Sequence, residues 1–437
     1  MTASTHQRIA VIGAGISGVS AGRMLTEKGH EVVIYEKEEK PGGLIRCDRI
    51  DGNLFHKVGG HVFNAKNKEV SDWFWKHFDR NKEFIKAERN AKILLNGKMI
   101  GYPLENHLYQ LEEDTVAQIT RELLELQAKG YKDPFSYANF EDFLQGNFGE
   151  ALYNLYFKPY NEKIWKVDLS TVPMPWLEGK LPMPDYNKIF LNNITRSGEK
   201  EMVHSTFYYP KQGGSQFIID RLAEGLTIKS NTPVEELKCL EGQWYVNGEG
   251  PYDKIIYTGD IRQLPNTLQL PSTKQLNTST AKLFLNPLNL LNSPNSLRSN
   301  STSNLLCYTD TTDLSWLYLP EADLQAHRII YTGNFSETNN APGGRKTCVV
   351  EFSGKVSLDI MKKEIKKLPG NLEAISSNYG ASSYVIQNSD TRSIIENLKK
   401  GLKPLNFHIS GRFAEWEYYN MDAAMEVTMK TLNNNFV

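Results

Sequence analysis

The chain of 437 residues has few cysteines, and they are widely scattered. Cys47, Cys239, Cys307 and Cys348 form neither a CxxC pair nor a cluster with histidine. This spacing argues against a structural zinc site or a redox pair, so no metal site is predicted. Cysteines without a pairing pattern suit a reducing compartment, and a cytoplasmic location is therefore expected.

The chain also lacks a long apolar run and an excess of either charge. No stretch of about 20 apolar residues is present, so no membrane span and no membrane partner are expected. Lys and Arg number 50 and Asp and Glu 51, for a formal net charge of −1. Without a basic excess, nucleic acid is not an expected partner. An anionic substrate must then be bound by a few local Arg and Lys side chains. Whether the protein forms a homo-oligomer is left open by the sequence.

A glycine-rich turn near the N-terminus is the strongest signal that is present. Residues 8–13, RIAVIG, predict a strand that leads through Gly13, Gly15 and Gly18 into a helix, and a second strand, EVVIYE, ends on Glu36. This order of strand, turn, helix and acid is the dinucleotide-binding GxGxxG fingerprint. The glycines let the backbone approach a pyrophosphate at the helix N-terminus, and Glu36 can accept hydrogen bonds from a ribose. A βαβ turn without a ligand is the weaker alternative.

A second glycine pair follows the acid, in Pro41-Gly42-Gly43-Leu44, with Arg46 close behind. This arrangement resembles the FAD-binding oxidase superfamily, in which a further backbone approach serves the longer cofactor.

The length predicts two or three domains, and the order of the elements predicts an α/β fold. We expect a discontinuous Rossmann-like FAD-binding domain, interrupted by a helical insert and by an antiparallel β-sheet domain. The predicted divisions are 1–76, 203–262 and 405–437 for the FAD-binding domain, 104–200 for the helical substrate domain with an exposed, mobile loop at 166–185, and 77–103 with 263–404 for the sheet domain.

Several local elements can be predicted within these divisions. Residues 85–103 read as a β-hairpin with Asn96-Gly97 as its turn. Residues 281–286, AKLFLN, read as a strand, and residues 305–400 as strands with one helix, SLDIMKKEIKKL. The segment DLSWLYLPEADLQAHR reads as one strand, and the C-terminal tail as a strand, a loop and a closing helix.

Further short motifs occur in a set order along the chain. They are Gly59-Gly60-His61-Val62-Phe63, Gly101-Tyr102-Pro103-Leu104-Glu105-Asn106, Pro159-Tyr160-Asn161-Glu162-Lys163-Ile164-Trp165, and Gly411-Arg412-Phe413 running to Asn420-Met421-Asp422. Together they resemble the UDP-galactopyranose mutase family, particularly its eukaryotic branch. The resemblance spans nearly the whole chain.

The resemblance implies a flavoenzyme that interconverts the pyranose and furanose forms of a nucleotide sugar, UDP-galactopyranose or a close relative, in cell-surface polysaccharide biosynthesis. In the family, N5 of reduced FAD bonds to the anomeric carbon and displaces the nucleoside diphosphate. NAD(P)H is a candidate reductant. The sugar, the base and the physiological reductant stay open.

The resemblance also assigns site residues, each with a structural role in the core or on the surface as its alternative. His61 would border the flavin, Arg328 would contact the diphosphate, and Lys180 stands where the family's mobile loop carries an arginine. The substrate-binding residues implied are Tyr102, Asn161, Trp165, Tyr318, Tyr384 and Tyr418. The cofactor-binding residues implied are Gly13, Gly15, Ile16, Ser17, Gly18, Glu36, Lys37, Gly42, Gly43, Leu44, Arg46, Gly59, Gly60, Val234, Arg412, Met421 and Asp422.

Several positions depart from the family pattern, chiefly at the base. Leu104 replaces an aromatic residue, and Glu105 replaces an amide, which both donates and accepts hydrogen bonds. His204 replaces an asparagine, Phe335 replaces a tyrosine, and Lys180 lacks the bidentate fork of arginine. Two other classes therefore stay open: a flavin-dependent amine oxidase or protoporphyrinogen-oxidase-like enzyme, and a catalytically inactive protein that binds a flavin or a sugar nucleotide.

Overall fold

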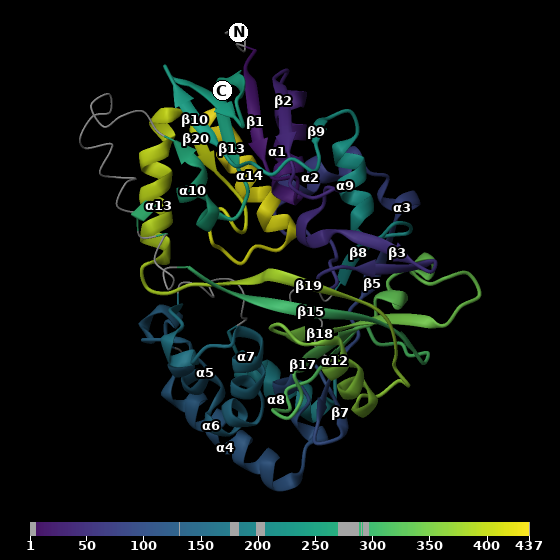
Figure 1. Ribbon diagram of the computed structural model, residues 1–437. Helices are drawn as coiled ribbons and strands as arrows, with labels where there is room; N and C mark the ends of the chain where they lie inside the picture. Colours follow the sequence, from purple (N-terminus) through teal and green to yellow (C-terminus); the bar gives the residue numbers. More distant parts are fainter. Residues whose placement is uncertain are drawn as a thin grey trace.

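The structure is a computed structural model that describes residues 6–130, 132–174, 183–197, 206–269, 288–289, 291 and 297–436. Figure 1 shows an upper lobe of helices around a parallel sheet, a second sheet of long strands across the middle, and a lower lobe of helices. The predicted α/β class, with a Rossmann-like domain, a helical insert and an antiparallel sheet, is confirmed. No helix in the described part of the chain is both long and apolar enough to cross a bilayer.

The parallel sheet of the upper lobe has the strand order β20-β13-β1-β2-β9. The chain enters this sheet three times, through β1 (Arg8–Ile12) and β2 (Glu31–Tyr35), then β9 (Thr227–Lys229) and β13 (Lys254–Tyr257), and finally β20 (Phe407–Ile409). Successive residues of β1 face opposite sides. Ile9 and Val11 pack on one side with α1 (Ile16–Glu27), α9 (Ser215–Ala223) and α14 (Met421–Asn435), whereas Ala10 and Ile12 pack on the other.

The other face of the parallel sheet is covered by a small sheet and by a helix that we did not predict. The small sheet has the order β12-β11-β10-β14, with β10 (Leu237–Leu240), β11 (Gln243–Val246), β12 (Glu249–Tyr252) and β14 (Leu268–Gln269). The expectation of one helix in 305–400 was wrong, because α13 (Thr391–Leu402) follows the predicted α12 (Leu358–Glu364). Ile394, Ile395, Leu398 and Leu402 form its buried stripe, a helical spacing that the sequence already carried.

The second sheet joins distant parts of the chain in the order β19-β15-β18-β17-β16-β6-β7. Its strands are β6 (Ala91–Leu95), β7 (Lys98–Gly101), β15 (Arg298–Thr309), β16 (Trp316–Tyr318), β17 (Ala326–Ile330), β18 (Lys346–Ser353) and β19 (Glu373–Ile386). All neighbours are antiparallel except β6 and β16. The segment predicted as one strand before Arg328 is thus two strands, β16 and β17, because the chain turns after Leu319.

The predicted hairpin at 85–103 is correct in its turn and too long at its start. β6 and β7 pair around Asn96 and Gly97, which have φ values of 51° and 74°. Residues before the hairpin form a separate strand, β5 (Phe84–Glu88), which pairs with β8 (Thr206–Pro210) instead. Two short strands, β3 (Cys47–Ile50) and β4 (Asn53–His56), also pair, and α2 (Lys68–His77) and α3 (Arg80–Glu83) follow them.

The lower lobe packs its helices around aromatic side chains. It contains α4 (Glu113–Lys129), α5 (Phe140–Phe148), α6 (Glu150–Leu152), a π-helical turn (Tyr153–Phe157), α7 (Lys158–Trp165) and α8 (Tyr186–Thr195). The start of the predicted mobile loop is exposed only in part: Lys166, Asp168, Ser170 and Thr171 are exposed, whereas Leu169, Val172 and Met174 are buried in this core. Residues 175–182 of that loop, and the predicted strand 281–286, lie outside the described residues.

Candidate active site

The first glycine loop brings backbone close to backbone at the end of β1. Gly13 has a φ of +97°, and its amide donates to Tyr35 O at 2.7 Å. A Cβ atom on Gly18 would lie 1.8 Å from Gly13 O, so only glycine lets the first turn of α1 approach the loop this closely. Ile16 and Ser17 begin α1, and the N-cap residue Gly15 makes no side-chain hydrogen bond to the first turn, so the N-terminal amides of this helix suit an anion.

The second glycine loop lies directly against the first. A Cβ atom on Gly43 would lie 3.2 Å from Gly15 Cα, and the Gly42 amide donates to Ala14 O at 2.9 Å. Glu36 closes the same corner, since its Oε2 accepts from the Ala14 amide at 2.7 Å. Residues 13–18 and 42–46 therefore form one recess lined by backbone, which we call the dinucleotide cradle.

Distant segments complete the surroundings of the cradle. A Cβ atom on Gly411 would meet Ser17 Oγ at 2.5 Å, so the 411–412 turn lies on the start of α1. Thr232 donates to Glu36 O at 2.8 Å, which brings the segment with Val234 to the same corner. Met421 and Asp422 begin α14 nearby, and burial raises the pKa of Asp422. Lys37, by contrast, points outward: its Nζ lies 4.0 Å from exposed Glu38.

The sheet below the cradle presents a row of polar residues that its register aligns. Tyr318 is opposite Arg328, Arg328 is opposite Glu351, and Glu351 is opposite Asn304. Directly opposite residues of neighbouring strands point to the same face. Asn304 Oδ1 accepts from the Gly59 amide at 3.0 Å, so the Gly59-Gly60 segment lies over this row.

Arg328 and Glu351 form the electrostatic centre of this row. Arg328 Nη2 lies 2.7 Å from Glu351 Oε2 and donates to Tyr384 Oη at 3.1 Å, while Tyr384 donates to Glu351 Oε1 at 2.6 Å. Burial alone would raise the pKa of Glu351, but Arg328 and His327 hold it well below its usual range. The carboxylate is thus ionised and almost completely buried, whereas 23% of the arginine side chain is exposed.

A β-bulge gives this strand pair its unusual geometry. Ala326 is opposite Phe352 and Arg328 is opposite Glu351, so His327 is the extra residue. Because of this extra residue, two consecutive side chains reach one carboxylate: His327 Nε2 lies 3.1 Å from Glu351 Oε1. Burial lowers the pKa of His327, although Glu351 opposes that shift.

His61 follows the two glycines that pass over Glu351 and Arg328. A Cβ atom on Gly59 would meet Glu351 Oε2 at 3.1 Å and Arg328 Nη2 at 3.2 Å, and one on Gly60 would meet Ile330 at 2.6 Å. Burial, with the nearby charges of Arg412 and Arg328, lowers the pKa of His61 to about 4. Its Nε2 lies 2.8 Å from Val58 O, which can only accept, so the neutral ring keeps Nδ1 as an acceptor.

Aromatic rings lie on one side of Arg328. The Trp165 ring lies edge-on to the rings of Tyr384 and Tyr418 at 5.4 and 5.7 Å, and these two tyrosines stack at 5.8 Å. Asn161 Oδ1 accepts from Trp165 Nε1 at 3.1 Å, so the two residues share a helix face as their spacing predicts. Arg412 lies 4.2 Å above the Tyr418 ring and donates to Ser383 O, which links the upper lobe to β19.

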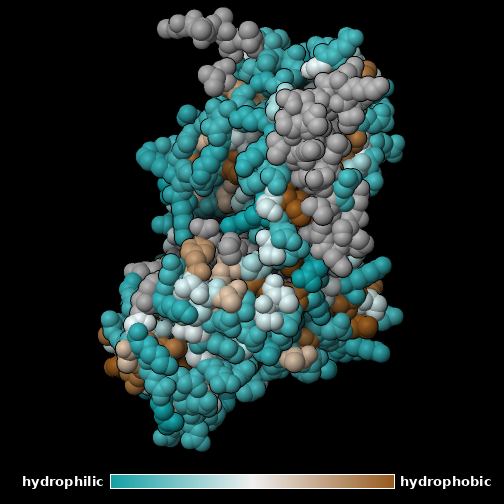
Figure 2. All heavy atoms as spheres, turned by 90° about the vertical axis from the view of Figure 1, so that its left-hand side faces the viewer, coloured by the Kyte–Doolittle hydropathy of each residue, from teal (hydrophilic) through white to brown (hydrophobic). Residues whose placement is uncertain are grey.

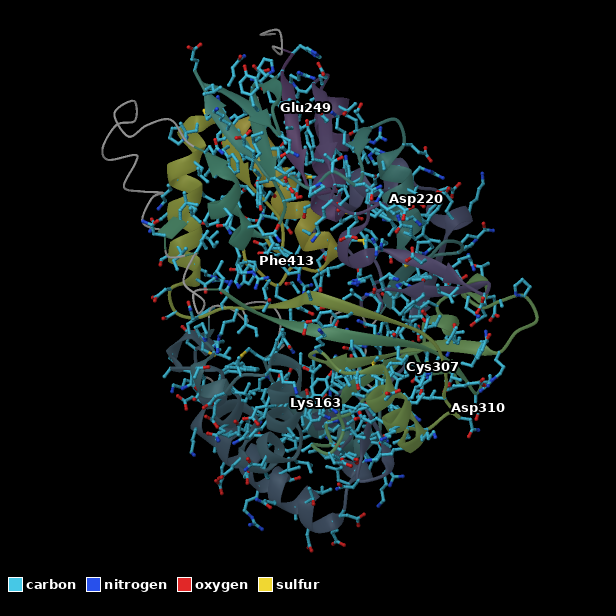
Figure 3. The ribbon with its side chains drawn as sticks, in the orientation of Figure 1. Lys163, Asp220, Glu249, Cys307, Asp310 and Phe413 are labelled. Carbon is cyan, nitrogen blue, oxygen red and sulfur yellow. The ribbon has the colours of Figure 1, made fainter. Side chains whose placement is uncertain are left out.

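Figures 2 and 3 show this junction from two sides. In Figure 2 the surface is hollowed between the two lobes. In Figure 3 Phe413, which follows Arg412, lies at the lower edge of the upper lobe, facing the long strands of the second sheet.

A second aromatic group surrounds Arg89. The Tyr102 and Tyr318 rings lie 4.8 Å apart, and Tyr160 stands edge-on to Tyr318 at 5.5 Å. Arg89 lies over the Tyr102 ring at 4.8 Å and donates to Tyr318 Oη. We call Tyr102, Tyr160, Trp165, Tyr318, Tyr384 and Tyr418 the aromatic cleft. Beside Tyr102 is a cavity of about 420 Å³, lined by Arg89, Lys92, Lys98, Tyr109 and other residues.

The structure thus brings most of the predicted site residues to two adjoining places, the cradle and the cleft. Lys180 and His204 lie outside the described residues. Leu104 is buried, and Phe335 packs in the core against Tyr209. Among the described residues, no group of three side chains suited to a metal ion is found.

Sequence reasoning missed Glu351, His327 and Arg89. Glu351 did have a signal, a lone acid in the apolar run Val349-Val350-Glu351-Phe352. Such an acid in a strand that is otherwise apolar indicates a buried charge that needs a partner. The bulge at His327 and the rings around Arg89 depend on pairings between distant segments, and no local pattern marks them.

Comparisons with known proteins agree with this architecture. A family model for the NAD(P)-binding Rossmann-like domain matches residues 11–78. A probable UDP-galactopyranose mutase of Klebsiella pneumoniae is 24% identical over 260 residues, 59% of this chain and 61% of that protein. A dTDP-fucopyranose mutase of Escherichia coli is 25% identical over 210 residues, 46% of this chain and 54% of that protein. In both cases the matched part is less than two thirds of the relative.

Longer alignments come from a third relative and from solved structures. The UDP-galactopyranose mutase of Mycoplasma genitalium is 21% identical over 97% of this chain and 93% of its own length. A crystal structure of reduced UDP-galactopyranose mutase matches with a TM-score of 0.84 and 22% identity over 98% of this chain and 95% of that one. A putative protoporphyrinogen oxidase from Exiguobacterium matches with a TM-score of 0.71 and 14% identity over 98% of both chains. The resemblance indicated by the sequence motifs is thereby confirmed: the chain has the fold of a UDP-galactopyranose mutase and is similar in sequence to curated UDP-galactopyranose and dTDP-fucopyranose mutases.

Proposed function

We propose that this protein is an FAD-dependent pyranose–furanose mutase that acts on a nucleotide sugar, UDP-galactopyranose or a close relative. The observation that carries the proposal is the position of Arg328. It lies in an aromatic cleft, beneath the Gly59-Gly60 segment, and the buried charge of Glu351 holds it there. A departing diphosphate needs a fixed cation of this kind.

The dinucleotide cradle fits FAD. Gly18 and Gly43 stand where a Cβ atom would be blocked by backbone, and the N-terminus of α1 faces the recess they leave. The pyrophosphate would be held by residues 13–18 and 42–46, and the ribose by Glu36. The far end of the cofactor would be held by Arg412, Met421 and Asp422. When bound and reduced, the flavin would supply the nucleophile for the anomeric carbon of the sugar.

Arg328 would bind the diphosphate with one edge of its guanidinium group. Glu351 Oε2 lies 3.2 Å from Nε and 2.7 Å from Nη2, so it takes the hydrogens of one edge. The Nη1 edge is then the one that can donate to phosphate oxygens without breaking this pair. Tyr418 would add a hydroxyl donor, and Lys180 a second cation. Tyr384, whose hydroxyl donates to Glu351 and accepts from Arg328, would line the diphosphate site and hold Arg328 in place.

His61 would act as a neutral group beside the flavin. Because burial lowers its pKa to about 4, it carries no charge at neutral pH. Its Nδ1 is an acceptor, since Nε2 is committed to Val58 O. A second positive charge at this position would compete with Arg328 for Glu351, so neutrality preserves the pair.

The identity of the base rests on Tyr102 and its surroundings. Tyr102 would stack on the base, while Asn161 and Trp165 would contact the nucleotide. Glu105, when ionised, only accepts hydrogen bonds, which favours a base edge that presents donors. Relatives named for UDP-galactopyranose and dTDP-fucopyranose support a nucleotide sugar as the substrate class.

The test is incubation of dithionite-reduced protein with UDP-, dTDP- and GDP-linked sugars, followed by separation of pyranose and furanose products. We expect interconversion by the reduced protein and none by the oxidised protein. NADPH and NADH would then be compared as reductants in place of dithionite. Absence of turnover with every sugar, despite tight FAD binding, would refute the proposal. Steady oxygen consumption with an amine or a porphyrinogen would favour the oxidase alternative, which the fold of the putative protoporphyrinogen oxidase keeps open.

A further inference from the structure

Lys163 is a buried lysine at the junction between the lower lobe and the second sheet (Figure 3). Its side chain leaves α7 and ends among backbone carbonyl groups. Nζ donates to Leu319 O at 2.6 Å, to Glu321 O at 2.5 Å and to Ala326 O at 3.3 Å. The three protons of one ammonium group are thus matched by three acceptors, which removes much of the cost of burying the charge.

Ala326 is held from the opposite side as well. Its amide donates to Glu364 Oε1 at 2.6 Å, and Glu364 belongs to α12. Ala326 itself is completely buried. One residue of β17 is therefore fixed through its carbonyl by Lys163 and through its amide by Glu364.

This fixed residue is where the β-bulge begins. The pairing of β17 with β18 starts at Ala326, opposite Phe352; His327 is the extra residue, and pairing continues with Arg328 opposite Glu351. Leu319, the second carbonyl partner of Lys163, follows Tyr318 directly and donates through its amide to His327 O at 3.0 Å. Lys163 therefore contacts both ends of the turn that separates Tyr318 from Arg328.

We propose that Lys163 is a positioning residue for nucleotide binding: with Glu364 it fixes the bulge that directs Arg328 toward Glu351 and into the aromatic cleft. The proposal rests on the proposed function only in assigning a nucleotide to that cleft. Lys163 lies on the same short helix as Asn161 and Trp165, so it also ties one wall of the cleft to the strands that form the other.

The charge state of Lys163 gives the proposal a pH dependence. Burial lowers the pKa of Lys163 to about 8; the carboxylates of Glu364, Asp323 and Glu321 oppose the shift, and Lys166 adds to it. Loss of the proton removes one of three donors. The position of Arg328 should therefore loosen above about pH 8 in the wild type.

The test compares Lys163→Met with Lys254→Met in protein loaded with FAD. Lys254 is a matched control because its Nζ also donates to a backbone carbonyl, Asn435 O at 2.7 Å, at the start of β13 in the upper lobe. We expect Lys163→Met to weaken the binding of uridine diphosphate by about tenfold or more, since small displacements of a binding group are costly. Lys254→Met should change it less than about twofold. The binding of uridine diphosphate should weaken above pH 8 in the wild type but not in Lys163→Met.

A crystal structure of Lys163→Met gives a readout that does not depend on activity. We expect the Arg328–Glu351 contact to lengthen or break. An unmoved Arg328, or equal effects of the two methionine variants on uridine diphosphate binding, would overturn the proposal. If Lys163→Met does not fold, Glu364→Ala removes the other hold on Ala326 and must shift Arg328 in the same way. If the wild type neither binds uridine diphosphate nor isomerises any sugar nucleotide, the proposed function fails, while the position of Arg328 still decides this inference.

Discussion

Replacing Glu351 with glutamine should destabilise the protein in the absence of substrate and make its stability unusually dependent on nucleotide. The substitution keeps the shape of the side chain but removes the charge opposite Arg328. Removing one partner of a buried ion pair costs roughly 3–5 kcal/mol. We expect the free energy of unfolding to fall by an amount near the lower bound, about 3 kcal/mol, because the Arg328 side chain is 23% exposed and glutamine can still accept a hydrogen bond.

The pH dependence of this loss has a definite sign. The folded-state pKa of Glu351 lies well below that of a glutamate in the unfolded chain. A lowered carboxylate pKa contributes stability above the unfolded pKa, and that contribution is lost as the pH falls through the folded pKa. The difference in the free energy of unfolding between wild type and Glu351→Gln should thus be constant above about pH 5 and shrink below about pH 4.

The assay is urea unfolding followed by tryptophan fluorescence, with and without uridine diphosphate. The diphosphate supplies a negative charge to Arg328, so it should restore more stability to Glu351→Gln than it adds to the wild type. Glu83→Gln is the matched control: Glu83 also lies 2.7 Å from an arginine, Arg221, but the pair is partly exposed, so its loss should be below about 1 kcal/mol. A similar small loss for Glu351→Gln would refute the reasoning that Arg328 depends on this charge.

Three further predictions concern the cradle and the cleft. Gly18→Ala should abolish FAD binding, because its Cβ atom would lie 1.8 Å from Gly13 O. Gly29→Ala is strained by its φ of +87°, but its Cβ atom meets nothing within 4 Å, so this variant should retain the flavin absorbance. NMR titration should place the pKa of His61 near 4. Because this pKa is lowered in the folded state, the free energy of unfolding should fall relative to that of His61→Gln as the pH falls from about 6.5. Titration near the ordinary value would contradict the burial of this ring. Arg328→Ala should lower turnover about 10²-fold or more, roughly the cost of losing a charged contact to a leaving group; an unchanged rate would remove Arg328 from the site.

The sequence predicted the cradle well because its determinants are local. The GxGxxG turn, the acid at Glu36 and the second glycine pair all lie within 46 residues of the N-terminus, and each meets the others through short connections. The turn at Asn96-Gly97 was predictable for the same reason, since both residues tolerate positive φ. The missed helix α13 also had a local pattern and could have been found.

The cleft was less predictable because its determinants are pairings between distant strands. Glu351 becomes a partner of Arg328 only when β17 and β18 pair, and Tyr318 joins them only through β16. A register change of one residue would turn each of these side chains to the other face. The motif resemblance predicted Arg328 and Tyr318 as site residues without this register, but it gave no reason for their orientation.

The bulge at His327 shows why a local pattern cannot replace the register. In the unbroken strand that we expected to end at Arg328, strict alternation would place His327 and Arg328 on opposite faces. The extra residue breaks that alternation, and what stabilises it is remote: Lys163 comes from the lower lobe and Glu364 from α12. The direction of Arg328 is therefore a property of three segments together. Substitutions at Lys163 and Glu364 should consequently alter nucleotide binding, although neither side chain belongs to the aromatic cleft.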